Sequence, residues 1–269
     1  MKLFTNKKKL REEIGKINNI SFVPTMGFLH KGHESIIKKS VKGSGKTLVS
    51  IFVNPKQFNS RKDLKSYPRN TKNDIKILKK LKIDYLYKPS YADIYKFKTK
   101  NKIYLDKFAK ELCGQFRKGH FKGVIDVVNR LLEITNPKRI LLGNKDFQQL
   151  YLIKKHIMKN KIKTQVFPCK TIRDKNFIAY SSRLKKLNRN EKTKLIKIIK
   201  VLKKYKKDLI LKKQIYNFSK IKKKIISIGA KNVDYIKLID LKTLKKPKKN
   251  KFNLFYAFYI GNVRLIDNF

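Results

Sequence analysis

Residues 22–33, FVPTMGFLHKGH, decide the fold of this chain. A β-branched and aromatic run ends in a Pro-Thr-Met-Gly turn, and His30 and His33 follow with Gly32 between them. This pattern predicts a buried strand, a tight turn and a helix that begins near Gly32. Helix N-termini bind phosphates because they present unpaired N–H groups and the positive end of the helix dipole. Two imidazoles there can donate hydrogen bonds to a phosphate in transfer, although two surface histidines in a loop would give the same spacing.

Short apolar runs alternate with helical patterns on both sides of this stretch. We expect strands over residues 20–24, 47–53, 84–87, 138–142 and 164–167, and helices over 34–41, 70–82, 123–134 and 147–158. Such a βαβα alternation predicts an α/β fold with a Rossmann-like, doubly wound parallel sheet. Ligands of these sheets bind at the carboxyl ends of the strands, where the polar motifs of this chain also fall.

The sequence changes character after residue 171. Helices are expected over 191–205 and 214–228, and strands over 234–240, 252–261 and 263–266. We therefore divide the chain into a first domain, 1–171, and a second, smaller α/β domain, 172–269. The lysine run over 245–251 is expected to form an exposed turn.

The charge of the chain is extreme, with 70 Lys and Arg against 18 Asp and Glu and a net charge of +52. A nucleic-acid or membrane-surface binder is the first class that such a charge suggests. The lysines lie along almost every segment, however, which favours compositional drift in an AT-rich genome. Two cysteines are too few for a metal cluster or a disulfide framework, and no apolar run reaches the ~20 residues of a membrane span. We expect a soluble cytoplasmic protein.

Three further motifs follow predicted strands or loops. SIFVNPKQF over 50–58 places Gln57 after a buried strand, and LGNKDFQQL over 142–150 places Lys145 and Asp146 before a helix. Lys145 supplies a compact charge for phosphates, whereas Asp146 could bind a ribose hydroxyl or only cap the helix. YSSR over 180–183 offers two hydroxyls and a guanidinium for phosphate oxygens. Each motif alone is equally consistent with a solvated loop.

In this order and spacing the motifs resemble a known family. HxGH at a strand-to-helix turn is similar to the nucleotidyl-transfer signature of class I aminoacyl-tRNA synthetases and cytidylyltransferases. Together with YPR at 67–69, CGQFRKGHFKGV at 113–124 and IGNVRLIDN at 260–268, the motifs resemble the pantoate–β-alanine ligase family over nearly the whole chain.

The resemblance implies an ATP-dependent ligase that works in two steps. Pantoate would attack the α-phosphorus of ATP to give pantoyl adenylate and pyrophosphate, and β-alanine would then release AMP and form pantothenate. Magnesium would arrive with ATP, and no metal site in the protein is expected. The resemblance also implies a cytoplasmic homodimer, formed through the first domain, and a second domain that acts as a lid.

The resemblance assigns site residues as follows. His30, His33 and Lys145 would be catalytic, with His33 as the proton donor. Gln57 and Gln149 would bind pantoate, and Gln57 would also help to place β-alanine. The ATP contacts would be Met26, Gly27, Phe28, Leu29, His30, Lys31, Gly32, His33, Gly143, Asn144, Lys145, Asp146, Ile172, Tyr180, Ser181, Ser182 and Arg183.

Five positions depart from the family pattern, and one of them, Lys118 in place of a proline, should loosen its loop. Asn144 stands where Glu is usual. Asp126 stands where Thr is usual, and a carboxylate near the substrate pocket could repel pantoate or could face away from it. Phe177 stands where Gly is usual and would be strained if that position requires a positive φ. Asp74 is the single acid near a place where related enzymes often carry two.

Two other functions are compatible with parts of the sequence. One is another HxGH nucleotidyltransferase that makes a dinucleotide or a CDP product. The other is a basic nucleic-acid-binding protein that kept a nucleotide fold, which would require basic residues and aromatics on one face. The set of Gln57, Gln149 and the YSSR motif favours the ligase, because a hydroxy acid must be bound beside ATP.

Overall fold

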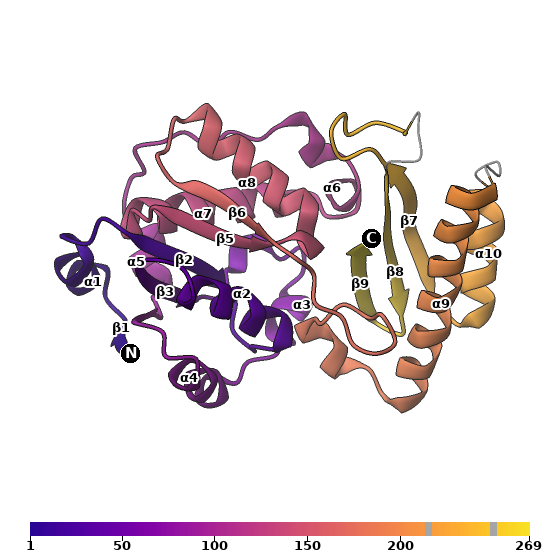
Figure 1. Cartoon of the computed structure of the whole chain (residues 1–269), viewed down its shortest axis with the longest axis horizontal. Coiled ribbons are helices and arrows are strands. Elements are labelled where there is room, and N and C mark those ends of the chain that lie inside the picture. Colours follow the sequence, from indigo (N-terminus) through magenta and orange to yellow (C-terminus); the bar gives the residue numbers. More distant parts are fainter. Residues whose placement is uncertain (213–216, 248–251) are drawn as a thin grey trace. The chain divides into compact units, whose positions relative to one another are not determined.

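The computed structural model of the chain describes residues 1–212, 217–247 and 252–269. Its contacts divide the chain into two compact units, Met1–Thr171 and Ile172–Phe269. Figure 1 shows a sheet flanked by helices in the first unit and a smaller sheet with two helices in the second.

The first unit is built on a six-stranded parallel sheet. Its order is β1 (Lys2–Phe4), β4 (Tyr85–Tyr87), β3 (Lys46–Ile51), β2 (Ile20–Thr25), β5 (Arg139–Gly143) and β6 (Gln165–Cys169). The chain adds strands outward from β2 in one direction and then returns to add β5 on its other side. The predicted doubly wound parallel sheet is therefore confirmed, with its switch point between β2 and β5.

Both faces of this sheet are covered. On one face, residues of β2, β3, β4, β5 and β6 pack against α2 (Lys31–Val41) and α4 (Thr71–Lys80) in a cluster that includes Val23, Ile37, Val49, Leu78 and Leu141. Strand side chains alternate between faces, and the intervening Phe22, Leu48 and Ile140 are also fully buried. Burial on both faces explains why the strands are nearly continuous apolar runs.

The remaining elements of the first unit connect these layers. They are α1 (Lys7–Ile14), η1 (Pro55–Gln57), α3 (Arg61–Lys65), α5 (Tyr91–Tyr95), η2 (Lys107–Lys110), α6 (Cys113–Phe116), α7 (His120–Thr135), η3 (Asn144–Asp146) and α8 (Phe147–Lys159). Strand β1 and helix α1 were not predicted. Strand β6 runs through Pro168, beyond its predicted end at residue 167, because an edge strand tolerates a residue without an N–H.

The second unit has a three-stranded antiparallel sheet in the order β7 (Asn232–Ile239), β8 (Asn253–Ile260) and β9 (Val263–Asn268). Helices α9 (Arg189–Lys212) and α10 (Phe218–Ile228) pack on it through a core that includes Ile198, Leu202, Ile225, Leu254 and Phe258. Helix η4 (Ser182–Lys186) precedes α9. Helix α9 extends beyond its predicted end at residue 205. Residues 214–216 of the predicted helix 214–228, and 248–251 of the predicted lysine turn, lie outside the described residues.

Within the described residues, no helix combines the length and the apolar character that a membrane crossing requires.

Candidate active site

The turn after β2 lies at the switch point of the sheet and has an unusual backbone. Gly27 and Phe28 both adopt a positive φ, of 77° and 52°. The buried carboxylate of Asp74, at the start of α4, accepts hydrogen bonds from the backbone N–H groups of Phe28 (2.8 Å) and Leu29 (2.7 Å). Because charged acceptors form strong hydrogen bonds, Asp74 fixes a backbone conformation that a phenylalanine rarely adopts. Asp74 therefore serves the histidine turn, and both of its oxygens are engaged there.

His30 and His33 lie against each other at the start of α2. Their rings stack with centroids 4.0 Å apart, so the alternative of two solvated surface histidines is wrong. His30 is the N-cap of α2, and its Nδ1 accepts a hydrogen bond from the N–H of Gly32 (3.2 Å). A neutral His30 therefore carries its proton on Nε2. The Nδ1 atom of His33 is buried and has no hydrogen-bond partner among the described residues.

Both imidazoles are held in the neutral form. Burial, and then the ammonium of Lys145, lower the pKa of His30 to about 4, against a smaller opposing effect of Asp146. Burial, His30 and Lys145 also hold the pKa of His33 well below its ordinary value. The pair is thus a neutral hydrogen-bonding surface in the ligand-free protein. This coupling also shows that the turn after β5 brings Lys145 close to the histidines.

The turn after β5 forms the second half of the site. Strand β5 ends at Gly143, η3 follows, and α8 begins at Phe147. A side chain at Gly143 would meet Ile36 of α2 at 3.4 Å, so the end of β5 packs closely against the helix that follows the histidine turn. Lys145 is largely buried, and its Nζ lies 3.5 Å from Asp146. Asp146 occupies the N-cap position of α8 without a capping hydrogen bond, so the capping alternative for its side chain is not supported.

The backbone donors of the histidine turn are less available than the sequence indicates. The N–H of Gly27 donates to Thr25 Oγ1 (3.2 Å), and those of Phe28 and Leu29 donate to Asp74. The side chain of Leu29 belongs to the core, whereas Met26 is partly buried and Lys31 is exposed. A phosphate at this turn would therefore be bound mainly by imidazoles, by Lys145 and by the helix dipole.

Gln57 lies beside the histidine turn, where its side chain is 8% exposed. Its Nε2 lies 3.1 Å from the sulfur of Met26, and its Oε1 accepts a hydrogen bond from Asn54 Nδ2 (3.2 Å). Asn54 in turn donates to Gly123 O (3.0 Å) and accepts from Tyr95 (2.8 Å). The sequence did not predict this support by Asn54 and Tyr95, which come from separate segments. A solvated loop glutamine is excluded for Gln57.

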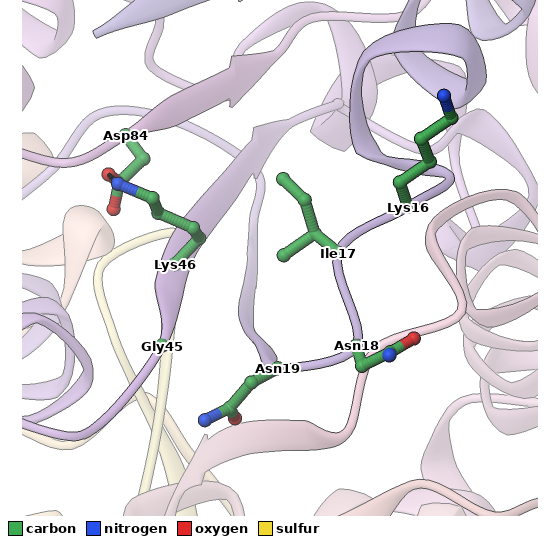
Figure 2. Close-up of a pocket in the computed structure, with 7 residues that line it drawn as sticks. All are labelled: Lys16, Ile17, Asn18, Asn19, Gly45, Lys46 and Asp84. Atoms are coloured by element: carbon green, nitrogen blue, oxygen red, sulfur yellow. Dashed lines mark ion pairs between the residues drawn. The ribbon is translucent and has the colours of Figure 1, made fainter.

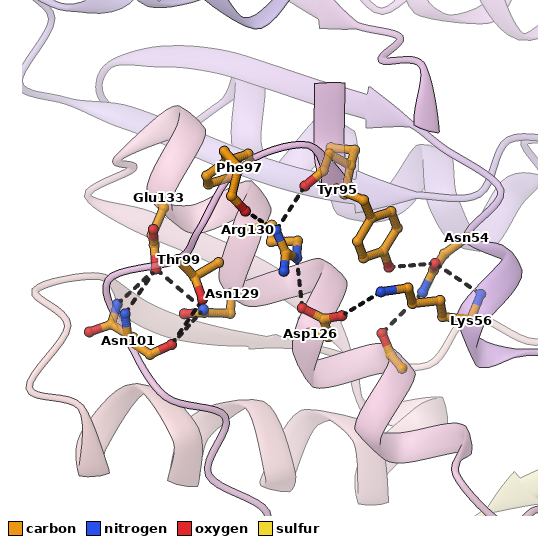
Figure 3. Close-up of polar contacts among 12 residues, drawn as sticks. Asn54, Lys56, Tyr95, Phe97, Thr99, Asn101, Asp126, Asn129, Arg130 and Glu133 are labelled. Atoms are coloured by element: carbon orange, nitrogen blue, oxygen red, sulfur yellow. Dashed lines mark hydrogen bonds and ion pairs between the residues drawn. The ribbon is translucent and has the colours of Figure 1, made fainter. Parts of the chain in front are cut away.

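Asp126 does not present a free carboxylate to the pocket. Figure 3 shows it between two cations: Arg130 Nε at 2.7 Å, one helical turn later, and Lys56 Nζ at 3.5 Å. Lys56 also lies over the ring of Tyr95, 3.9 Å from its centroid. The expected repulsion of an acid substrate is thus offset by two neighbouring positive charges. The same contacts tie η1, which carries Gln57, to α7.

Two adjacent glutamines on α8 have different surroundings. Gln148 is buried, donates to Phe108 O and Glu111 O at 2.7 Å each, and accepts from the N–H of Cys113. Gln149 is partly exposed, and its amide makes no hydrogen bond within the described part of the chain. Gln148 therefore holds α6 and η2 in place, while Gln149 keeps its hydrogen-bonding capacity for a ligand.

The remaining predicted ATP contacts lie together in the second unit. The N–H of Tyr180 donates to Ile172 O (3.2 Å), so these two residues are neighbours. Ser181 caps η4 by accepting from the N–H of Arg183 (3.3 Å), Ser182 is buried, and Arg183 Nη1 donates to Arg264 O (3.3 Å). Phe177, just before this loop, has a φ of 67°, so the condition under which a phenylalanine is strained at this position is met.

A hollow on the first unit lies at the opposite edge of the sheet. Figure 2 shows its lining, which includes Asn19 before β2, Lys46 at the start of β3 and Asp84 before β4. Lys46 and Asp84 form an ion pair of 2.9 Å there. Since ligands of doubly wound sheets bind at the carboxyl ends of the strands, we assign the site to the two turns and not to this hollow.

Comparison with known proteins agrees with this geometry. The family model described as pantoate-beta-alanine ligase matches residues 2–269. The chain is 46% identical to the pantothenate synthetase of Flavobacterium psychrophilum over 177 aligned residues. The alignment covers 65% of this chain and 63% of that protein. It is 38% identical to the pantothenate synthetase of Endomicrobium trichonymphae, with 100% and 97% covered. The solved pantoate-beta-alanine ligase of Francisella tularensis, complexed with beta-gamma ATP and beta-alanine, has 38% identity and a TM-score of 0.86, with 100% and 97% covered.

Proposed function

The chain belongs to the pantoate–β-alanine ligase family, and we propose that its two strand-end turns carry out the ATP-dependent ligation of pantoate with β-alanine. The observation that carries this assignment is the stacked His30–His33 pair beside Lys145 at the switch point of the sheet. The residues named below for each step are part of the proposal.

In the first step, a carboxylate oxygen of pantoate attacks the α-phosphorus of ATP, and the bond to pyrophosphate breaks. Such in-line transfer requires positioning and charge stabilisation more than covalent help. Lys145 supplies positive charge, and the Nε2–H of His30 donates to a phosphate oxygen. His33 is the second imidazole at the reacting phosphate. Because its pKa is lowered, we assign it as a neutral hydrogen-bond donor, whereas the family resemblance makes it a proton donor.

In the second step, the amine of β-alanine attacks the carbonyl carbon of pantoyl adenylate. The carbon–oxygen bond to AMP breaks, and the amine loses a proton as the amide of pantothenate forms. Gln57 and Gln149 hold the pantoyl group, and the neutral Asn54–Tyr95 support behind Gln57 keeps its amide in place.

ATP contacts beyond the histidine turn are proposed at Gly143, Asn144, Lys145 and Asp146, and in the second unit at Ile172, Tyr180, Ser181, Ser182 and Arg183. Asn144 replaces a family glutamate while Lys145 and Asp146 are kept, so ATP binding is retained. Magnesium is proposed to enter as MgATP and to be held by phosphate oxygens. Asp74 does not fit a magnesium ligand, because both of its oxygens accept backbone N–H groups in a buried place.

The assembly and the location are proposed on the resemblance. We expect a homodimer formed through the first unit, with the second unit acting as a lid domain. A cytoplasmic location agrees with the two buried cysteines, Cys113 and Cys169, which are not in a disulfide.

The test is to measure pyrophosphate release from the purified protein with MgATP, with and without D-pantoate. We expect pantoate-dependent pyrophosphate, followed by AMP and pantothenate once β-alanine is added. Pyrophosphate release by the folded protein that does not depend on pantoate would contradict the substrate assignment.

A further inference from the structure

We propose that Arg173 is a positioning residue for ATP, which sets the shape of the 172–183 segment by joining its tip to strand β9. The inference rests on the proposed function, because it takes Ile172 and the Tyr180, Ser181 and Arg183 loop as ATP contacts. It adds to that function a residue which touches neither ATP nor the reacting atoms.

The segment forms one hairpin. Arg173 pairs with Ala179 in an antiparallel bridge, and the N–H of Tyr180 donates to Ile172 O (3.2 Å). At the tip, Asp174 Oδ1 accepts from the N–H groups of Asn176 and Ile178 at 2.9 Å each. The proposed adenine contact and the proposed phosphate contacts therefore start from opposite arms of the same hairpin. Its shape fixes the distance between the two parts of the ATP site.

One side chain connects this hairpin to the sheet. The guanidinium of Arg173 donates to Phe177 O (3.1 Å) at the tip and to both carboxylate oxygens of Asp267 on β9. It also donates to Asn268 O (2.9 Å). The side chains of Arg173 and Asp267 are 13% and 5% exposed, so the pair is shielded from water. Two-pronged recognition of this kind fixes orientation as well as distance, and a lysine could not reproduce it.

Aromatic rings complete the connection. The Arg173 guanidinium lies 4.4 Å from the ring centroid of Phe177, and the Phe177 and Phe269 rings meet edge to face at 5.3 Å. Lys203 of α9 lies over the Phe177 ring at 4.1 Å. A cation placed over an aromatic face is attracted by the negative charge of that face. These contacts stabilise Phe177 in its left-handed conformation, where the family usually has glycine.

The experiment compares Arg173→Lys and Asp267→Asn with a matched control, Asp234→Asn. Asp234 pairs with the side chain of Arg264 at 2.7 Å in the same sheet, with side chains 4% and 6% exposed, and forms no hydrogen bond or ion pair with residues 172–179, all of which the structure describes. Arg183 contacts Arg264 at its backbone oxygen, which the substitution leaves in place. KM for ATP, KM for pantoate and kcat are measured by pyrophosphate release, and the unfolding midpoint by thermal denaturation.

We expect Arg173→Lys and Asp267→Asn to raise KM for ATP about 10-fold, with KM for pantoate within about twofold of wild type. Asp234→Asn should lower the unfolding midpoint to a similar extent and leave KM for ATP within about twofold. Unchanged KM for ATP in both test variants, or an equal rise in the control, would overturn the proposal.

A milder variant tests the proposal if Arg173→Lys does not fold. Tyr256→Phe removes only the hydroxyl that donates to Asp267 (3.2 Å) and should raise KM for ATP by a smaller factor, about fourfold. If Arg173→Lys does not fold and Tyr256→Phe leaves KM for ATP unchanged, the proposal fails. Failure of the proposed ligase function can be distinguished from failure of the Arg173 proposal, because the wild-type protein would then show no pantoate-dependent pyrophosphate release.

Discussion

The histidine turn of the first unit and the 172–183 hairpin of the second both hold a phenylalanine in a strained backbone conformation, but different contacts stabilise it. Each contains a phenylalanine with a positive φ: Phe28 at 52° and Phe177 at 67°. Each also depends on a buried carboxylate, Asp74 or Asp267. Asp74 accepts directly from the backbone N–H groups of the turn, whereas Asp267 acts through the guanidinium of Arg173.

This difference in how the carboxylate supports the backbone indicates how sensitive each loop is to a single substitution. A non-glycine residue in the left-handed region costs ~1–3 kcal/mol, so each loop needs contacts that outweigh this cost. In the histidine turn one carboxylate, that of Asp74, accepts hydrogen bonds from the N–H groups of both Phe28 and Leu29. In the hairpin the contacts are shared among Arg173, Asp267, Phe269 and Lys203. We therefore expect single substitutions to affect the histidine turn more than the hairpin.

The largest expected effect is that of Asp74→Ala. Without the carboxylate, the N–H groups of Phe28 and Leu29 lose their acceptor, the turn relaxes, and His30 and His33 no longer face the phosphate. We expect turnover to fall about 100-fold, the size of the loss when a charge-stabilising group is removed. Steady-state pyrophosphate release measures this effect.

The matched control for this variant is Asp93→Ala. Asp93 also accepts backbone N–H groups, from Lys7 and Ser90, but at the start of α5. Its loss should reduce stability and leave turnover within about threefold. If folded Asp74→Ala protein turned over as fast as this control, the contrast between the two loops would be wrong.

A second, smaller effect separates the substrates. Gln149→Ala should raise KM for pantoate about 10-fold and leave KM for ATP within about twofold, because its free amide is assigned to the acid. Arg173→Lys should have the opposite effect, raising KM for ATP and leaving KM for pantoate nearly unchanged. Gln148→Ala, one residue away from Gln149, should instead lower stability by ~1–3 kcal/mol, because the buried N–H of Cys113 loses this acceptor and the carbonyls of Phe108 and Glu111 each lose one of their two donors. Equal rises in both KM values for Gln149→Ala would remove it from the pantoate site.

Replacing Phe177 by glycine tests whether the hairpin depends on its aromatic contacts. Glycine relieves the strain at φ 67° but removes the contacts with Arg173, Lys203 and Phe269. We expect a net destabilisation of ~1 kcal/mol, measured by urea denaturation. Stabilisation by this substitution would mean that the strain outweighs the stacking.

The smallest effect concerns pH and is confined to the first unit, which holds all four histidines of the chain. The folded pKa of His30, like that of the buried His156, is lowered from 6.5 to about 4. Their stabilising contribution is therefore fully present above pH 6.5 and is lost as pH falls towards 4. Imidazole NMR signals should show His30 neutral at pH 6, and kcat/KM for ATP should stay level down to about pH 5. A charged His30 at pH 6 in the ligand-free protein would contradict this assignment.

The sequence predicts the sheet well because each buried strand is a continuous apolar run that ends in a polar turn. It also places His30, His33 and Lys145 at strand ends, where the parallel order brings them together. It does not predict the side chains that hold these turns. Asp74 lies more than 40 residues from the histidine turn, and Asp267 more than 90 from Arg173, so neither contact has a local pattern. The sequence shows that Phe177 stands where glycine is usual. It does not show that Arg173, Lys203 and Phe269 stabilise the phenylalanine there.

The central claim is that the carboxylate of pantoate attacks the α-phosphorus of ATP at the histidine turn. It is tested most directly with pantoate that carries ¹⁸O in both carboxylate oxygens, followed by mass spectrometry of the products after addition of β-alanine. We expect one ¹⁸O atom in AMP and one in pantothenate, with none in pyrophosphate. AMP without label, or label in a phosphate product other than AMP, would contradict it.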